Sequence, residues 1–170
     1  MPLIIEIKAK CKSSETIHQI LNKRQADFKG VDHQIDTYFN VNNGRLKLRE
    51  GNIENHLIHY LRPNEAGPKK SEVVLFKSDP ASTLKDILKI ACGVLVTVDK
   101  KRAIYFIGNV KFHLDEVKEL GSFLEIEAID MYGNIGEEEL LKQCKFYMDL
   151  FRVEHEDLVD LSYSDLLLKK

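Results

Sequence analysis

The sequence predicts an α+β fold: a closed or nearly closed barrel of eight antiparallel strands, with a polar charged lumen and flanking helices. Several short segments alternate strictly between apolar and charged residues, which is the period of a strand with two different faces. Turn signals separate these segments at short intervals, as expected for antiparallel neighbours. Amphipathic helices interrupt the series and can cover the apolar faces, so that the charged faces line the inside of the barrel.

The first half of the chain opens with a strand over residues 4–10. Ser13-Ser14-Glu15 then predicts a helix start, since hydroxyl side chains cap a first turn and an acid favours it. Apolar residues at helical spacing extend this helix over residues 14–26, and residues 27–31 are predicted to form a loop. Four strand signals follow, at residues 32–40, 45–50, 56–62 and 71–77, with Asn42-Asn43-Gly44 as a hairpin turn and a Pro/Gly/Lys loop at 63–70.

The second half opens with a helix over residues 82–92 that Gly93 ends. Its apolar residues are expected to face inward, namely Leu84, Ile87, Leu88 and Ala91. Four strand segments follow in close succession, at residues 94–100, 102–107, 110–117 and 123–130. A helix over residues 137–151 has an apolar side made of Leu140, Leu141, Cys144, Tyr147, Met148 and Phe151, and the tail at 162–168 is expected to form a short helix.

The charged faces of the strands gather residue types that bind phosphate and metal. Four strands carry such a face, made of Glu6, Lys8 and Lys10, of Arg45, Lys47 and Arg49, of Lys111, His113 and Asp115, and of Glu125 and Glu127. A charged face on one strand is usually the solvated side of a half-buried sheet. Because so many strands share the pattern, we expect one continuous charged surface, which suits a polyphosphate with a divalent metal.

The composition limits the partners. The 170 residues suffice for a sizeable core, so we expect a single domain over residues 1–170. The formal net charge of −2, from 25 basic and 27 acidic residues, argues against bulk binding of nucleic acid. Three widely spaced cysteines fit neither a disulfide framework nor a metal site. Without a targeting segment or a long apolar run, we expect a cytoplasmic protein with no membrane partner, and an apolar helix face leaves a homodimer open.

Short motifs along the chain add a second kind of signal, because their order is informative. The N-terminal strand carries Ile4-x-Glu6-x-Lys8. The later motifs are Asp36-Thr37-Tyr38-Phe39, Gly44 to Glu50, Tyr60-Leu61-Arg62-Pro63, Lys100 to Tyr105, His113 to Val117, Leu120 to Glu127, and Ser162 to Leu167. Together they resemble the CYTH superfamily, which includes class IV adenylyl cyclases and thiamine triphosphatases. The block from Asp115 to Glu127 and the tail are most similar to the bacterial class IV cyclase branch.

The resemblance implies a triphosphate tunnel in which basic side chains bind phosphates and carboxylates hold Mg²⁺ or Mn²⁺. The phosphate-binding candidates carried over by position are Lys8, Lys10, Arg45, Lys47, Arg49, Arg62, Arg102 and Lys111. The metal candidates are Glu6, Glu125, Glu127 and Asp115, and the catalytic candidates are Lys8, Asp115 and His113.

The resemblance also implies an enzyme that acts on a triphosphate, and in the cyclase branch the reaction converts ATP to cyclic AMP and pyrophosphate. A triphosphatase that hydrolyses inorganic, thiamine or nucleoside triphosphate is the alternative. One departure keeps a third possibility open: Ile4 stands where the family's N-terminal Glu-x-Glu-x-Lys motif has its first Glu. A non-catalytic module that only binds triphosphates therefore also fits.

Overall fold

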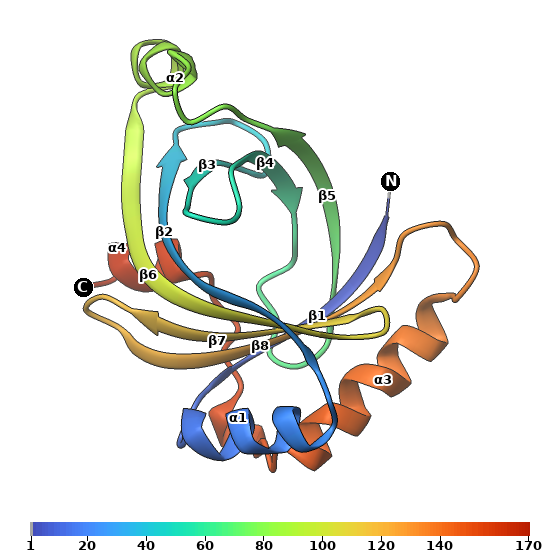
Figure 1. Ribbon diagram of the computed structural model, residues 1–170. Helices are drawn as coiled ribbons and strands as arrows, with labels where there is room; N and C mark the ends of the chain where they lie inside the picture. Colours follow the sequence, from blue (N-terminus) through green and yellow to red (C-terminus); the bar gives the residue numbers. More distant parts are fainter. Residues whose placement is uncertain (1) are drawn as a thin grey trace.

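Eight antiparallel strands form one closed barrel in the computed structural model, which describes residues 2–170 (Figure 1). The strand order is β1-β5-β4-β3-β2-β6-β7-β8, and β8 pairs with β1 to close the ring. The predicted barrel is therefore confirmed. The strands are β1 (Leu3–Lys10), β2 (Asp27–Phe39), β3 (Arg45–Glu50), β4 (His56–Leu61), β5 (Lys69–Lys77), β6 (Val94–Ile107), β7 (Val110–Val117) and β8 (Gly121–Asp130).

Four α-helices and one 3₁₀ turn accompany the barrel. They are α1 (Ser14–Lys23), α2 (Leu84–Cys92), α3 (Glu137–Leu150), η1 (His155–Asp157) and α4 (Tyr163–Leu168). The helix α1 begins where predicted, because the Ser13 hydroxyl accepts a hydrogen bond from the Thr16 amide. None of the helices within residues 2–170 combines the length and the hydropathy that crossing a membrane requires.

The main hydrophobic core lies outside the barrel wall, between the strands and the helices α1 and α3 (Figure 1). Ile5 and Ile7 of β1 point into this core, whereas Glu6 and Lys8 of the same strand line the lumen. The apolar side of α3 fits the prediction, since Leu140 and Cys144 are fully buried against the wall. The apolar faces of the strands are thus covered from outside, and the charged faces turn inward.

The segment that follows α3 packs into one end of the barrel. The Val159 amide donates to the Lys8 carbonyl, and the side chain of Tyr163 lies in a second apolar cluster with Val98, Val117 and Phe123. The helix α4 begins at Ser162, whose hydroxyl accepts from the Asp165 amide. We call this closed end of the lumen the inner end.

Two segments differ from the sequence prediction. Residues 27–31 belong to β2 and not to a loop, because pairing of Phe28 with Tyr105 on β6 extends the strand, and an irregularity at Gly30 absorbs the bend. The segments 94–100 and 102–107 form one strand, β6, without a turn. Glycine and charged residues in these segments favour a loop or a break locally, but pairing with distant strands outweighs that preference.

The helix α2 was expected to bury its apolar side, and that prediction is wrong. No residue of α2 is buried, and Ile87 and Ile90 are 58% and 88% exposed. Figure 1 shows α2 at one end of the barrel, away from the wall that α1 and α3 cover. A helical period reveals that a helix has two faces, but it does not reveal whether anything lies against the apolar one.

Candidate active site

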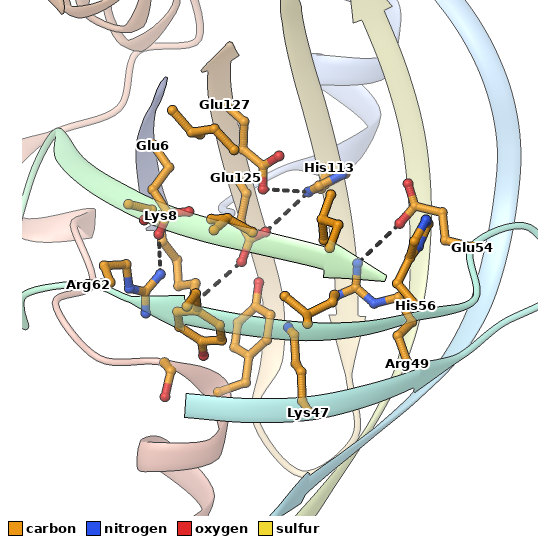
Figure 2. A pocket seen from close by; sticks show the side chains of 18 of the residues that line it. Glu6, Lys8, Lys47, Arg49, Glu54, His56, Arg62, His113, Glu125 and Glu127 are labelled. Carbon is orange, nitrogen blue, oxygen red and sulfur yellow. Dashed lines mark hydrogen bonds and ion pairs between the residues drawn. The ribbon is translucent and has the colours of Figure 1, made fainter. Parts of the chain in front are cut away.

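A cavity of about 180 Å³ occupies the lumen, and its lining is rich in charge (Figure 2). Most of the cations expected to bind phosphate line it: Lys8, Lys47, Arg49, Arg62, Arg102 and Lys111. His113, Glu6, Glu125 and Glu127 line it as well. Lys100 also lines the cavity, whereas its neighbour Lys101 is exposed on the other face of β6.

Lys10, Arg45 and Asp115 do not line this cavity. Lys10 is exposed at the end of β1. The Arg45 guanidinium lies near the surface and donates to Asp165 at 2.7 Å and to Asn64 at 3.0 Å. Asp115 is buried behind the lining, where other side chains use its carboxylate.

Strand register explains why the central charged residues meet. Lys8 of β1 pairs with Glu125 of β8, which in turn pairs with His113 of β7. Residues two positions away repeat this arrangement, since Glu6 and Lys111 both pair with Glu127. Cross-strand neighbours on one face lie close together, so the register places carboxylates and bases side by side. The Lys8 ammonium is 3.4 Å from Glu125 and 4.0 Å from the centre of the Tyr163 ring.

Asp36, on β2, organises three cations on the opposite wall. Arg49 donates to it from two nitrogens, both at 2.9 Å, Lys100 donates at 2.8 Å, and Lys47 at 3.0 Å. Burial alone raises the pKa of Asp36, but the three cations together hold that pKa well below its usual range. Burial lowers the pKa of Lys100 to about 7, against the opposing effect of Asp36.

Glu54 reaches the lumen from the loop between β3 and β4, and no motif or alternation in the sequence marks this residue as part of a site. The Asp32 carboxylate accepts hydrogen bonds from the amides of Ile53 and Glu54, both at 2.9 Å, which fixes this loop. The Glu54 carboxylate then accepts from Lys111 and, at 3.1 Å, from Arg49. Burial raises the pKa of Glu54, but these two cations lower it well below its usual range.

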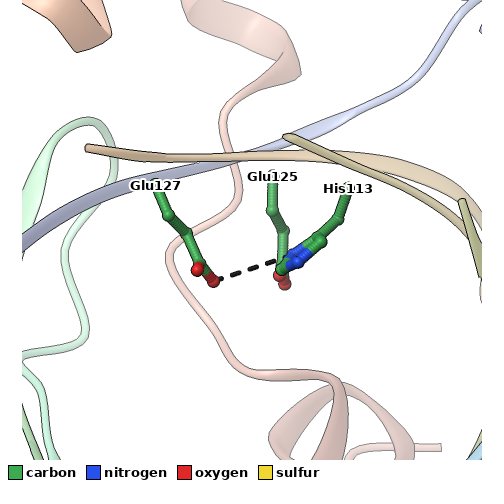
Figure 3. A group of neighbouring side chains, drawn as sticks. All are labelled: His113, Glu125 and Glu127. Atoms are coloured by element: carbon green, nitrogen blue, oxygen red, sulfur yellow. Dashed lines mark hydrogen bonds and ion pairs between the residues drawn. The ribbon is translucent and has the colours of Figure 1, made fainter. Parts of the chain in front are cut away.

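The imidazole of His113 and the carboxylates of Glu125 and Glu127 form the group best placed to hold a metal (Figure 3). Their nearest ligand atoms all lie within 4.8 Å of one another, and His113 Nδ1 is 3.1 Å from Glu125 and 3.7 Å from Glu127. Burial and the nearby Arg102 lower the pKa of His113, although the two carboxylates oppose this. A neutral imidazole beside two carboxylates fits a divalent cation.

Two hydrogen-bond donors of Arg62 have no acceptor among the described residues. Its side chain is 6% exposed, and Nη1 donates to Glu6. Among the described residues, nothing accepts from its buried Nε and Nη2. A buried guanidinium rarely leaves donors unsatisfied, so a ligand with several acceptor oxygens fits beside Arg62.

Cations and carboxylates alternate around the lumen, so the site neutralises its own charge. Lys8 and Arg102 both pair with Glu125, and Arg49 and Lys111 both pair with Glu54. A dianionic phosphate group that enters must take over cations from these carboxylates. A divalent cation on Glu125 would make that exchange easier, because it would give the carboxylate a new partner and release Lys8 and Arg102 for phosphate.

The chain matches known proteins by family and by fold. The model of the CYTH domain matches residues 3–145. A protein from Pyrococcus horikoshii is 25% identical, with a TM-score of 0.80 over 96% of this chain and 98% of that one. A candidate adenylate cyclase from Vibrio parahaemolyticus is 18% identical, with a TM-score of 0.74 over 98% of each chain. No curated protein matches the sequence.

A third solved structure joins both chemistries that the sequence left open. It is a candidate adenylyl cyclase from Hippeastrum with a dominant triphosphatase activity. Its identity to this chain is 15%, with a TM-score of 0.60 over 99% of this chain and 94% of that one.

Proposed function

This chain belongs to the CYTH domain family, and we propose that it is a divalent-metal-dependent enzyme whose substrate places a triphosphate in the barrel lumen. The observation that carries the proposal is the free donor pair of Arg62 in a cavity lined by further cations. A neutral ligand makes no strong electrostatic interaction with converging cations, whereas a triphosphate offers many acceptor oxygens and roughly four negative charges.

Cations at different positions in the lumen bind different parts of the phosphate chain. Lys8 lies beside Tyr163 at the inner end and binds one part of the phosphate chain, while Lys47, Arg49, Arg62, Arg102 and Lys111 bind the rest. Arginine suits this role because its planar fork reaches two phosphate oxygens at once. Lys10 and Arg45, which lie outside the cavity, take no direct part in this binding.

His113, Glu125 and Glu127 would hold the metal, and Glu6 lies beside Glu127 on the neighbouring strand. Carboxylates suit both Mg²⁺ and Mn²⁺, but an imidazole among the ligands favours Mn²⁺. A cation bound by these residues would neutralise charge on phosphate oxygens and supply a Lewis acid. The side chains of Lys8 and Arg102 add fixed positive charge to the same region, where charge develops as a phosphoanhydride bond breaks.

Hydrolysis is the reaction that the geometry supports best. The oxygen of a water attacks the terminal phosphorus and the water releases a proton to solvent, the bond from that phosphorus to the bridging oxygen breaks, and orthophosphate leaves together with a diphosphate. The protein needs only to position the chain of phosphates and to neutralise the leaving oxygen, and the lumen offers both.

Cyclisation of a nucleoside triphosphate is the second candidate. The ribose 3′-oxygen attacks the α-phosphorus, pyrophosphate leaves, and a cyclic nucleotide forms. The motifs from Asp115 to Glu127 and in the tail favour this reaction by resemblance. It demands that the nucleoside fold back over the α-phosphate.

Product analysis decides between these reactions. Purified protein is incubated with Mn²⁺ or Mg²⁺ and, separately, with ATP, thiamine triphosphate and inorganic triphosphate. Orthophosphate without cyclic nucleotide supports the hydrolase, and cyclic AMP with pyrophosphate supports the cyclase. Tight binding without any product would refute catalysis and leave the binding module that Ile4 suggested.

A further inference from the structure

One part of the cavity lining is apolar, in contrast to the rest of the lumen. Four aliphatic side chains make it up, and we call them the aliphatic shelf: Ile4, Ile58, Val73 and Leu75. They come from β1, β4 and β5, which are adjacent in the barrel.

Strand register makes the shelf continuous. Ile58 pairs directly with Leu75, and Ile4 pairs directly with Ser71, which lies two residues before Val73 on the same face of β5. Neighbours of this kind lie within side-chain contact on one face of a sheet. The shelf is therefore a single surface inside the barrel and not a set of scattered residues.

The shelf runs from the apolar cluster around Tyr163, where Ile58 and Val73 pack, to the open end of the lumen, where Leu75 and Ile4 lie. Leu75 is 54% exposed and Ile4 is half-buried, whereas Lys8 and Tyr163, near the inner end, are each 4% exposed. Solvent thus reaches the outer part of the shelf but hardly reaches Lys8. A ligand that sends its phosphates toward Lys8 leaves its other end against Leu75 and Ile4, with Ile58 and Val73 below them.

A polar atom beside the shelf also lacks a partner. Ser71 lines the cavity and is 2% exposed, and among the described residues nothing pairs with its hydroxyl. A buried hydroxyl usually finds a hydrogen-bond partner. An apolar surface with one free hydroxyl at its edge suits a group that is mainly apolar but carries a polar atom.

We propose that the aliphatic shelf and the Ser71 hydroxyl bind the organic group of the substrate, so that this protein prefers an organic triphosphate to inorganic triphosphate. The inference rests on the proposed triphosphate function, which it makes more specific. Adenosine and thiamine both offer a planar ring with polar atoms at its edge, and both fit this chemistry. Inorganic triphosphate has nothing to place on the shelf, and water would remain on the apolar surface.

The test uses variants that change the shelf and leave the phosphate-binding cations intact. The double variant Val73→Thr with Leu75→Thr makes the shelf more polar and places a β-branched residue, which suits a strand, at both positions. Ser71→Ala removes the free hydroxyl. Val74→Thr is the matched control, because Val74 is exposed on the opposite face of β5.

Calorimetric titration measures the dissociation constants of methylene-bridged analogues of ATP, thiamine triphosphate and inorganic triphosphate, which resist cleavage, with Mn²⁺ present. We expect the double variant to bind at least one organic analogue about tenfold more weakly, since small apolar changes in a pocket have effects of this size. Ser71→Ala should weaken the same analogue, and the inorganic analogue should bind all variants alike. The preferred organic analogue identifies the group that the shelf accepts.

The alternative outcomes separate the two proposals. Equal affinity of the wild type for all three analogues, or an equal loss for all three in the double variant, overturns the shelf but leaves the triphosphate site. Unchanged organic binding in both shelf variants overturns it too. Failure of the wild type to bind any analogue overturns the proposed function and the shelf with it.

Discussion

Asp115 holds Arg102 through two parallel hydrogen bonds, 2.7 Å from Nε and 2.6 Å from Nη2, and both side chains are buried. The Tyr163 hydroxyl donates to the same carboxylate at 2.8 Å. Asp115 therefore has little capacity left for a metal, although the sequence made it a metal and catalytic candidate. Its geometry instead makes it a positioning residue: it aims Arg102 at Glu125, 2.8 Å away, and anchors the tail.

The first prediction concerns Asp115→Asn. Breaking one partner of a buried ion pair typically costs about 3 to 5 kcal/mol, so we expect the free energy of unfolding to fall by roughly that amount. Urea denaturation measures it. Glu116→Gln is the control on the same strand, because Glu116 is exposed. A loss no larger than that of the control would contradict the structural role assigned to Asp115.

The second prediction compares Arg62→Lys with Arg45→Lys. Lysine keeps the charge but loses the planar fork, and each charge-assisted hydrogen bond contributes about 1.5 to 3 kcal/mol. We therefore expect Arg62→Lys to weaken binding of a triphosphate roughly tenfold or more, and binding of a monophosphate much less. Arg45→Lys should leave both unchanged, because Arg45 lies outside the cavity. Calorimetric titration of both variants checks this, and equal losses in the two would count against the lumen as the phosphate site.

The third prediction concerns the metal group. Glu125→Gln and Glu127→Gln each remove one carboxylate ligand, so metal-dependent turnover should fall by about 100-fold or more. Titration with Mn²⁺ should show weaker binding even without substrate. Circular dichroism and thermal unfolding establish that the variants fold. Wild-type turnover in the double variant would refute the assignment of these carboxylates.

The fourth prediction is a pH dependence of stability that comes from Lys100. Its pKa is about 7 in the folded protein, below its usual value of 10.5. Between these values the unfolded chain binds the extra proton, so Lys100 makes the free energy of unfolding rise as the pH increases from 7 to 9. Acidification below pH 7 ends this dependence, because Lys100 is then protonated in both states.

Denaturation curves at several pH values between 7 and 9 measure this slope. Lys100→Met should reduce it, because the variant has no group to protonate at that position. Lys101→Met is the control, since Lys101 is its exposed neighbour on the other face of β6. An unchanged slope in Lys100→Met would show that Lys100 stays fully protonated when folded.

The strand faces were predictable because the alternation of side chains is local. Successive side chains of β1 point to opposite faces of the sheet. Glu6 and Lys8 therefore face the lumen as expected, while Ile5 and Ile7 face the outer core. The same reasoning failed for residues 27–31. There the turn-prone Gly30 lies within a strand, because pairing with β6 outweighs the local preference.

The alternation along the strands suffices to predict a barrel with an apolar outside and a charged inside, and it restricts the phosphate and metal candidates to the charged strand faces. Which of these groups meet depends on the tertiary structure. Glu54 reaches the lumen because Asp32, 22 residues away, binds the amide of Glu54 and fixes its loop. Asp115 is occupied by Arg102 and by the tail, and the aliphatic shelf exists because three strands lie in register. Such encounters depend on strand pairing and loop contacts between distant parts of the chain, which no local period encodes.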